Sequence, residues 1–307
     1  MASPVRSGFV SIIGKPNVGK STLLNRLVGE RLSGVSKKPQ TTRGVIRGIL
    51  STPEGQAVFL DTPGFHDPRD PLGQWMIVQI HQALESSDLI FWMVFPNLPR
   101  TEDERLAREL EKSSVPVFVV INQVDRIPKP QVLPVIDAYR KFSRVREIIP
   151  ISALEGDNLP VLVRRTFETL PENPPYFPED LLTDQNERTI VSEIIREKVF
   201  RFTGEEIPYS SAVEIEEFKD RVGAGSSRPG QGNPAPTYIR AVIVVERDSQ
   251  RKILIGKGGA KIKQIGQAAR RDIEPFLGKK VFLELWVKVL KDWKTDPSAL
   301  RRLGFGA

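Results

Sequence analysis

The fold of this chain is decided by the stretch Gly14-Lys15-Pro16-Asn17-Val18-Gly19-Lys20-Ser21. It follows the apolar run 8–13 and precedes a helical pattern over 22–28, which is the context that a phosphate-binding loop requires. Glycines allow a tight turn whose backbone N–H groups, with the start of the helix, face phosphate oxygens. Lys20 is expected to reach the β- and γ-phosphates, and Ser21 to bind Mg²⁺. The predicted phosphate-binding residues are Gly14, Lys15, Pro16, Asn17, Val18, Gly19, Lys20, Ser21 and Thr22.

A second motif favours guanine as the base. Asn122-Gln123-Val124-Asp125 closes the apolar run 115–121. The carboxylate of Asp125 can accept hydrogen bonds from N1–H and N2–H₂ of guanine, a donor pair that adenine lacks. Ser152-Ala153-Leu154 ends a later strand and fits the loop whose backbone amide meets the guanine O6. Either motif alone is a common strand-end turn, but together they favour GTP over ATP. The predicted guanine-binding residues are Asn122, Gln123, Asp125, Ser152, Ala153 and Leu154.

Two polar stretches between these motifs are predicted as switches that GTP orders and hydrolysis releases. In Asp61-Thr62-Pro63-Gly64 the carboxylate can hold Mg²⁺ through water, and the glycine amide can contact the γ-phosphate. In Lys38-Pro39-Gln40-Thr41-Thr42-Arg43 a threonine can reach the metal; Thr42 is favoured, and Thr41 remains the alternative. Switch I therefore includes Thr41 and Thr42, switch II includes Asp61, Thr62, Pro63, Gly64 and Phe65, and the predicted Mg²⁺ site consists of Ser21, Thr42 and Asp61.

These motifs resemble those of translation-factor-type P-loop GTPases, with two departures. Phe65 stands where Ras-type enzymes place a glutamine that orients the attacking water. Because an apolar ring cannot do this, we expect slow intrinsic turnover. The resemblance to GTPases with a hydrophobic residue here implies that Asn17 helps to bind K⁺; the alternative is that Asn17 only shapes the loop. Gln123 replaces the usual lysine, which predicts some loss of affinity without loss of the specificity carried by Asp125.

Composition bounds the class of protein. A chain of 307 residues is long for one domain and sufficient for two. The absence of cysteine excludes disulfides, thiol catalysis and cysteine-based metal centres. No apolar run approaches the roughly 20 residues that span a bilayer, and residues 1–8 do not resemble a signal peptide. The runs 89–95 and 115–121 are strand-sized and predict buried strands of a parallel sheet. We expect a cytoplasmic protein.

A domain boundary is predicted where four prolines fall within 171–178, because they forbid a continuous helix. The predicted domains are a GTPase domain over 1–171, a proline-rich linker over 172–181, and a second domain over 182–307. Net charge is +7, but from Tyr238 onward there are 16 Lys and Arg against 7 Asp and Glu. This concentrated positive charge indicates nucleic acid or an anionic membrane surface as the partner.

The second domain carries the pattern of a KH domain. A helical pattern over 185–202 and strand patterns over 212–218 and 238–246 come first, with a Gly/Ser/Pro-rich insert, 223–236, expected to be a hairpin loop. The Gly-x-x-Gly turn 256–259 is expected between an apolar strand and a helix. Such a turn lets an RNA backbone approach closely and displays about four unpaired bases to the neighbouring groove. The predicted RNA-binding residues are Ile255, Gly256, Lys257, Gly258, Gly259, Lys261, Ile262 and Lys263.

Aromatic residues near this turn are candidates for base stacking. The even spacing of Phe282 and Trp286 places both on one face of the strand predicted over 281–290, where we expect them to fill the core. Trp293 lies in a basic tail, which either reads RNA or forms a helix that covers the domain.

Over nearly its whole length the chain resembles the Era GTPases, on the motifs Lys38-Pro39-Gln40-Thr41-Thr42-Arg43, Asp61-Thr62-Pro63-Gly64 and Leu283-Glu284-Leu285-Trp286-Val287-Lys288-Val289. The expected fold is an α/β P-loop GTPase domain, with a mainly parallel sheet flanked by helices, followed by a smaller α+β KH domain of type II topology. The resemblance implies a cytoplasmic factor that uses GTP, GDP and Mg²⁺, binds the 3′ end of 16S rRNA as single-stranded RNA and helps to mature the 30S subunit. We expect a monomer.

Two other classes of function stay open. One is an RNA-binding scaffold in which nucleotide only stabilises the fold. The other is a GTPase that acts peripherally at the inner membrane or in cell-cycle control, with RNA binding secondary. A complete Lys20, Ser21 and Asp61 set speaks against the first, and the lack of a clear amphipathic basic helix speaks against the second.

Overall fold

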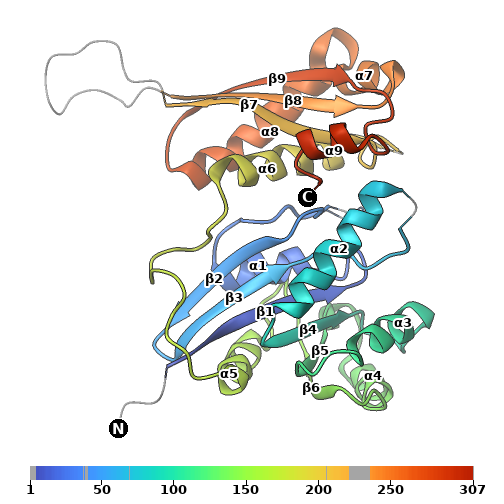
Figure 1. The fold of residues 1–307 in the computed structure, drawn as a ribbon, viewed down its shortest axis with the longest axis vertical. Coiled ribbons are helices and arrows are strands. Elements are labelled where there is room, and N and C mark those ends of the chain that lie inside the picture. The colour runs from blue at the N-terminus through green and yellow to red at the C-terminus, as the bar shows by residue number, and fades with distance from the viewer. Residues whose placement is uncertain are drawn as a thin grey trace, which may run out of the picture. The chain divides into compact units, whose positions relative to one another are not determined.

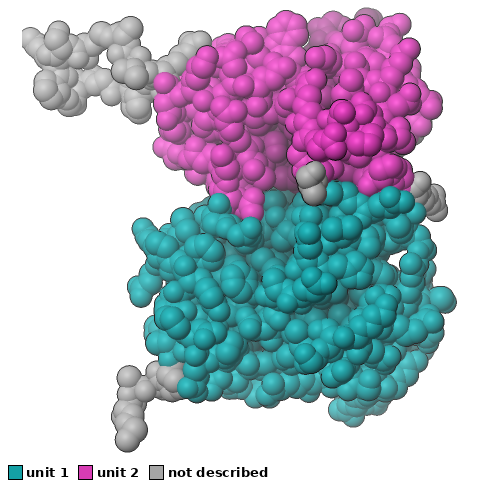
Figure 2. All heavy atoms as spheres, in the orientation of Figure 1, with its two compact units in different colours: residues 1–69, 73–184 teal, residues 70–72, 185–307 magenta. Residues whose placement is uncertain are grey.

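The computed structural model describes residues 5–36, 38, 41–68, 70–204, 206–220 and 236–306 (Figure 1). The chain divides into two compact units (Figure 2), residues 1–69 with 73–184 and residues 70–72 with 185–307. Except for Pro236, the insert predicted over 223–236 lies outside the described residues. Within the described ranges, no helix is both long enough and apolar enough to cross a membrane.

The first unit is built on a six-stranded sheet with the strand order β2-β3-β1-β4-β5-β6. All neighbouring strands are parallel except the β2–β3 pair. Every residue of β3, β4 and β5 is buried, as expected for strands covered on both faces. This confirms the predicted mainly parallel sheet. The strands are β1 (Arg6–Gly14), β2 (Ile46–Thr52), β3 (Gly55–Asp61), β4 (Leu89–Val94), β5 (Val117–Ile121) and β6 (Val145–Pro150).

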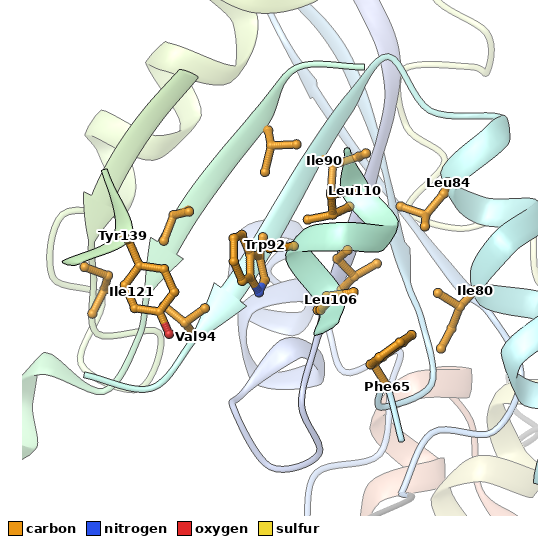
Figure 3. Close-up of a cluster of buried hydrophobic side chains, with 14 of the residues drawn as sticks. Phe65, Ile80, Leu84, Ile90, Trp92, Val94, Leu106, Leu110, Ile121 and Tyr139 are labelled. Carbon is orange, nitrogen blue, oxygen red and sulfur yellow. The ribbon is translucent and has the colours of Figure 1, made fainter. Parts of the chain in front are cut away.

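Helices flank this sheet. A large apolar cluster lies between β4, β5 and the helices α2, α3 and α4, with Trp92 of β4 near its centre (Figure 3). The ring of Tyr139 meets that of Trp92 edge-on, with centroids 5.4 Å apart. The helices are α1 (Lys20–Val28), α2 (Pro71–Glu85), α3 (Thr101–Leu110), α4 (Val132–Tyr139) and α5 (Leu159–Thr169), with short 3-10 turns η1 (Val124–Arg126) and η2 (Lys129–Gln131).

The proline-rich segment predicted as a linker has no helix or strand, and it ends in a turn in which the Leu181 amide donates to the Pro178 carbonyl at 3.1 Å. It lies along the first unit rather than standing free as a spacer. The side chain of Gln56 accepts hydrogen bonds from the amides of Tyr176 and Phe177 and donates to the Phe177 carbonyl, each at 2.9 Å. Farther along, the Ile49 amide donates to the Leu182 carbonyl at 2.8 Å. Prolines cannot donate backbone hydrogen bonds, so the other residues of the segment supply these contacts.

The second unit has helices packed on a three-stranded sheet of order β7-β8-β9, antiparallel between β7 and β8 and parallel between β8 and β9. The order α–β–β–α–α–β is the predicted type II arrangement of a KH domain. Its elements are α6 (Glu187–Phe202), β7 (Ser211–Lys219), β8 (Thr237–Val245), α7 (Asp248–Ile255), η3 (Lys257–Gly259), α8 (Ala260–Leu277), β9 (Val281–Val289) and α9 (Pro297–Arg302).

The expectation of an apolar strand before the Gly-x-x-Gly turn is wrong, because residues 248–255 form the helix α7. The Gln250 side chain accepts hydrogen bonds from the amides of Glu246 and Arg247 and so caps the start of this helix. Leu254 lies on the buried side of this helix. Capping and burial on one side favour the helix over the strand that the apolar run predicted.

The expectation that Phe282 and Trp286 fill the core is also wrong, since their side chains are 53% and 56% exposed. Both do lie on one face of β9, but the opposite face of that strand is the one that meets α8, where a Cβ on Gly266 would lie 3.4 Å from Leu285 Cδ1. Trp293 is fully buried, and its indole N–H donates to the Ser210 carbonyl at 3.1 Å. The tail therefore covers the domain, which is the second of the two alternatives given for it.

Candidate functional site

The loop between β1 and α1 encloses one side of a cavity of about 590 Å³ in the first unit. Gly14 has φ 154°, and a Cβ there would lie 2.3 Å from the Met93 carbonyl oxygen. Gly19 has φ 105°, and a Cβ there would lie 2.3 Å from the Asn122 amide nitrogen. Only glycine fits these two positions. The lining residues are Pro16, Asn17, Gly19, Lys20, Ser21, Thr22, Gly34, Val35, Ser36, Thr41, Thr42, Gly64, Phe95, Asn122, Gln123, Asp125, Arg126 and Leu154.

Lys20 lies inside this loop. Its ammonium donates to the carbonyls of Gly14 and Lys15 at 3.3 and 3.2 Å, and the residue is buried. Burial lowers the pKa of Lys20 to about 8, although the negative charge of Asp61 opposes the shift. The Lys15 side chain takes another course, since its ammonium pairs with Asp103 at 2.7 Å. The Lys20 side chain therefore lines the cavity, whereas the Lys15 side chain is directed to Asp103.

Asp61 is the centre of a buried polar cluster at the end of β3. Its Oδ2 accepts hydrogen bonds from Ser21 and Ser33, each at 2.7 Å, and from Thr42 at 3.3 Å. Burial raises the pKa of Asp61, opposed by Lys20 and by these hydroxyl groups. Its other oxygen, Oδ1, is buried and has no hydrogen-bond partner among the described residues. A carboxylate oxygen without a hydrogen-bond partner, beside the hydroxyl groups of Ser21 and Thr42, fits Mg²⁺, which prefers oxygen ligands.

The structure separates the two candidate threonines. The Thr42 hydroxyl lies 2.9 Å from Ser21 Oγ, in the cluster around Asp61. The Thr41 hydroxyl instead donates to the Lys38 carbonyl at 3.0 Å. Lys37, Pro39 and Gln40 lie outside the described residues. The geometry therefore favours Thr42 as the metal ligand. Ser33 belongs to the same cluster but was not predicted, because no motif marks it.

The second switch approaches the phosphate loop through Gly64. A Cβ on Gly64 would come within 2.8 Å of Pro16, so a side chain is excluded there. The Phe65 amide donates to the Gly14 carbonyl at 3.0 Å, while the Phe65 ring is 9% exposed and joins the apolar cluster with Leu106 (Figure 3). The ring therefore points into the core and offers nothing to an attacking water. Thr62, just before Pro63, is fixed to β1, since its Oγ1 and its amide both donate to the Ile12 carbonyl, at 2.9 and 3.4 Å.

Asn122 connects the base-side loops to the phosphate loop. Its Nδ2 donates to the Val18 carbonyl at 2.7 Å, and its Oδ1 accepts from the Ala153 amide at 2.9 Å. Gln123 forms a second hydrogen bond to the phosphate loop, because its Nε2 donates to the Asn17 carbonyl at 3.1 Å. Asn122 thus links the loop that contains Val18 to the loop that contains Ala153 and fixes the position of one relative to the other.

The remaining base-side residues lie at the rim of the cavity. Asp125 is exposed and lines it, as does the exposed side chain of Leu154. Ser152 is buried, and its hydroxyl accepts a hydrogen bond from the Glu155 amide at 3.1 Å, which fixes the turn. The structure thus brings members of the predicted phosphate, metal and guanine sets to one cavity, which is lined by Lys20, Thr42 and Asp125 among others.

The second predicted site is the turn between α7 and α8. Gly256 has φ 72°, and a Cβ there would meet the Lys261 amide nitrogen at 3.1 Å. Gly258 and Gly259 have φ 58° and 78°, and a Cβ on either would meet open space. An RNA backbone can therefore approach both glycines closely.

The side chains around this turn divide by exposure. Lys257 and Lys263 are exposed, whereas Ile255, Lys261 and Ile262 are half-buried. Among the described residues, Lys257 forms no ion pair. The turn therefore combines open backbone, free positive charge and apolar surface, which are the properties that a single-stranded RNA requires.

Comparisons with known proteins find matches for both units of the chain. Residues 9–123 match the family model of a 50S ribosome-binding GTPase, and residues 206–294 match that of a KH domain. The chain is 49% identical over 304 residues to GTPase Era of Geobacter metallireducens, with 99% of each chain covered. The chain belongs to the Era family of GTPases. It is also 44% identical to GTPase Era of Clostridium botulinum, over 98% of each chain.

Two solved structures of Era resemble the whole chain. One is a point variant of Aquifex aeolicus Era bound to GDP·AlF4⁻, and the other is Era in complex with MgGDPNP and nucleotides 1506–1542 of 16S ribosomal RNA. Each is 43% identical, has a TM-score of 0.92, and is matched over 99% of this chain and 100% of its own. This Era-family chain is a GTPase with a C-terminal KH domain.

Proposed function

We propose that this Era-family GTPase is a GTP-controlled switch that binds the 3′ region of 16S rRNA through its KH domain and assists maturation of the 30S subunit. The observation that carries the proposal is the presence, on one chain, of a complete nucleotide cavity and an open Gly-x-x-Gly turn. The solved Era complex with MgGDPNP and 16S nucleotides contains both kinds of ligand. We place the protein in the cytoplasm as a monomer.

In the nucleotide site, Lys20 would bind the β- and γ-phosphates, and the Gly64 amide would contact the γ-phosphate. Ser21 and Thr42 would hold Mg²⁺, with Asp61 acting through water, and the ion would supply positive charge to the phosphate oxygens. Phosphoryl transfer depends mainly on such positioning and charge. Since Phe65 is buried in the core, no side chain at that position orients the attacking water, and intrinsic hydrolysis is slow.

At the base, Asp125 would accept hydrogen bonds from N1–H and N2–H₂ of guanine. The Ala153 amide already donates to Asn122, so the next amide of the loop, that of Leu154, is the donor we assign to O6. Gln123 is held to the phosphate loop through its own amide. Its aliphatic stem is shorter than that of the usual lysine, so it covers the base less well.

Asn17 is proposed as a ligand of K⁺. It lines the cavity beside the phosphate loop and has φ 63°, a conformation that asparagine adopts more readily than most residues. A monovalent cation here would supply charge that no catalytic glutamine provides. Hydrolysis faster in KCl than in NaCl, with the difference lost in Asn17→Ala, would support this role. Equal rates in both salts would leave Asn17 as a residue that only shapes the loop.

The KH site would hold RNA through the open backbone of Gly258 and Gly259, with Lys257, Lys261 and Lys263 near its phosphates. Bases would lie against Ile255 and Ile262, and Gly256 would keep the turn close to α8. About four unpaired nucleotides fit such a groove. Affinity is expected to fall with added salt, because bound lysines release counterions from the RNA.

The decisive experiment measures affinity for a single-stranded RNA copying the 3′ end of 16S rRNA, with GDP and then with a non-hydrolysable GTP analogue, at one salt concentration. A preference under one nucleotide would establish the switch, because coupling between two binding sites is reciprocal. Equal, tight binding under both would retain the RNA site and remove the switch. Absence of RNA binding, with sedimentation on anionic liposomes, would favour action at the inner membrane.

A further inference from the structure

Arg126 directly follows the predicted guanine motif, is exposed, and lines the nucleotide cavity beside Asp125. It is the last residue of the 3-10 turn η1. Its Nη1 donates a hydrogen bond to Gln123 Oε1 at 2.7 Å, and its amide donates to the Gln123 carbonyl at 3.1 Å. The turn and the side-chain bond therefore hold the guanidinium group of Arg126 next to the side chain of Gln123.

Gln123 uses both ends of its side-chain amide. Its Nε2 donates to the carbonyls of Asn17 and Val18 at 3.1 and 3.4 Å, while its Oε1 accepts from Arg126. The Gln123 side chain is thus fixed between the phosphate loop and Arg126. A lysine side chain has no acceptor atom and could not hold a guanidinium group in this way. The bond to Arg126 therefore depends on the glutamine that replaces the usual lysine in this chain.

Most of the Arg126 guanidinium is available to a ligand. The bond to Gln123 engages a single N–H group, and a guanidinium carries several others. Among the residues that the structure describes, this group has no other hydrogen-bond partner, forms no ion pair and lies over no aromatic ring. In the same part of the chain, the carboxylate of Asp125 forms no hydrogen bond or ion pair either. Both side chains at this end of the cavity are therefore free to contact a base.

We propose that Arg126 covers one face of the guanine base and replaces the longer lysine stem that the motif lacks at Gln123. A guanidinium group is planar and stacks on aromatic faces, and every nucleobase offers such a face. Because Gln123 already holds the group, little conformational freedom is lost when the base binds. The inference rests on the proposed position of guanine at Asp125. With it, the glutamine motif retains affinity that Gln123 alone would lose.

Titrations with GDP and with guanosine, which has no phosphates, test this contact. Arg126→Ala is expected to weaken the binding of both by the same factor, about fivefold or more, because the lost contact is with the base. A loss confined to GDP would overturn the proposal, since it would place the action of Arg126 on the phosphates. Arg140→Ala is the matched control. It removes an exposed arginine of the same unit, paired with Asp137 at 2.9 Å and absent from the cavity lining, and should bind both ligands normally.

A double-mutant cycle tests the pairing with position 123. In the Gln123→Lys background the lysine stem covers the base by itself, so adding Arg126→Ala should change GDP affinity less than about twofold. In the unmodified background the same substitution should cost about fivefold or more. Equal losses in the two backgrounds would show that Arg126 does not take the place of the lysine, and would overturn the proposal.

A further measurement uses the protein without substitutions. The ring current of a stacked base should move the δ-methylene protons of Arg126 upfield when GDP or guanosine binds, as seen by NMR of arginine-labelled protein. The resonance is assigned by its loss in Arg126→Ala. Absence of this shift, or unchanged guanosine affinity in Arg126→Ala, would refute the contact. Failure of the guanine assignment itself is seen separately, because Asp125→Asn would then bind GDP normally.

Discussion

The Ser33 hydroxyl donates a hydrogen bond of 2.7 Å to Asp61 Oδ2, in the buried polar cluster that also contains Ser21 and Thr42. Ser33 is held there by Asn25, whose side chain accepts from the Ser33 amide at 2.9 Å and donates to its carbonyl at 2.8 Å. A buried carboxylate needs such donors to remain ionised. The helix that follows the phosphate loop thus positions, through Asn25 and Ser33, the acid of the second switch.

Replacing Ser33 with alanine should weaken this arrangement. The substitution removes one of three hydroxyl donors from buried Asp61 and should lower the free energy of unfolding by about 1–2 kcal/mol. GTP affinity at fixed Mg²⁺ should fall as well, because the carboxylate becomes harder to ionise. Chemical denaturation and nucleotide titration would measure both effects. Ser86→Ala is the control, since Ser86 follows the last residue of α2 and its hydroxyl donates to the Ala83 carbonyl of that helix. Equal stability of the two variants would contradict the assigned role.

Asp125→Asn should change the base preference of the cavity. Asparagine cannot accept both guanine donors, so GTP affinity should fall at least about 100-fold. Xanthine carries a carbonyl in place of the guanine amino group, and the new amide can donate to it, so affinity for XTP should rise. Competition titrations with GTP and XTP would show this exchange. Asp157→Asn, an exposed carboxylate in the neighbouring loop, should alter neither affinity. Unchanged GTP binding in Asp125→Asn would refute the guanine assignment.

Nucleotide affinity should fall as pH rises above about 8. Burial lowers the pKa of Lys20 to about 8 in the nucleotide-free protein, and bound phosphates favour its charged form. Above that pH binding must take up a proton, so affinity drops by up to about tenfold per pH unit; below it Lys20 is already charged and affinity stays level. GDP titrations without added metal would test this, with guanosine as the control that lacks phosphates. Level GDP affinity up to about pH 9.5 would contradict the prediction.

The lowered pKa of Lys20 also makes the free energy of unfolding depend on pH. Between about 8 and the ordinary value of 10.5, the unfolded chain binds a proton at Lys20 that the folded chain does not. The contribution of Lys20 to the free energy of unfolding therefore increases with pH across this window. Below it both states carry the proton, and the cost of burying the charge is present in full.

The sheet of the first unit was predictable because its central strands are continuous apolar runs with motifs at their carboxyl ends. The helix α7 was not, since the run Ile253-Leu254-Ile255 is short enough to suit either a strand or a helix, and its two isoleucines are β-branched, which favours a strand. Its cap by Gln250 and the burial of Leu254 favour the helix. In β9, alternation indicated that Phe282 and Trp286 share a face, but only packing against α8 shows which face is covered.

The residues of the candidate sites also divide into those that the sequence predicted and those that it did not. Lys20, Ser21 and Asp61 lie in contiguous motifs whose chemistry is readable from neighbouring residues. Ser33 carries no such mark, because it reaches Asp61 only through the three-dimensional contact with Asn25. Residues in local motifs were therefore predictable, and those positioned by tertiary contacts were not.

Phe65→Gln tests whether a glutamine at position 65 is sufficient to speed up GTP hydrolysis. In Ras-type enzymes a glutamine orients the attacking water, but here the side chain points into an apolar cluster with Ile80 and Leu106. Burying an amide there without a partner should lower the free energy of unfolding by about 1–3 kcal/mol and leave hydrolysis as slow as before. Single-turnover rates and thermal unfolding would separate the two effects. Faster hydrolysis in the variant would show that the side chain can turn toward the phosphates.

Gly258→Asp should abolish RNA binding and spare GTP hydrolysis measured without RNA. The new carboxylate would stand in the open space where an RNA phosphate approaches, and like charges repel. Gly278→Asp, at the other end of α8, is a closely matched control, because Gly278 has φ 64° against 58° at Gly258 and equally open surroundings. Both substitutions should therefore cost similar stability, which circular dichroism on heating would verify. RNA affinity retained in Gly258→Asp, or lost equally in Gly278→Asp, would remove the turn between α7 and α8 from the RNA site.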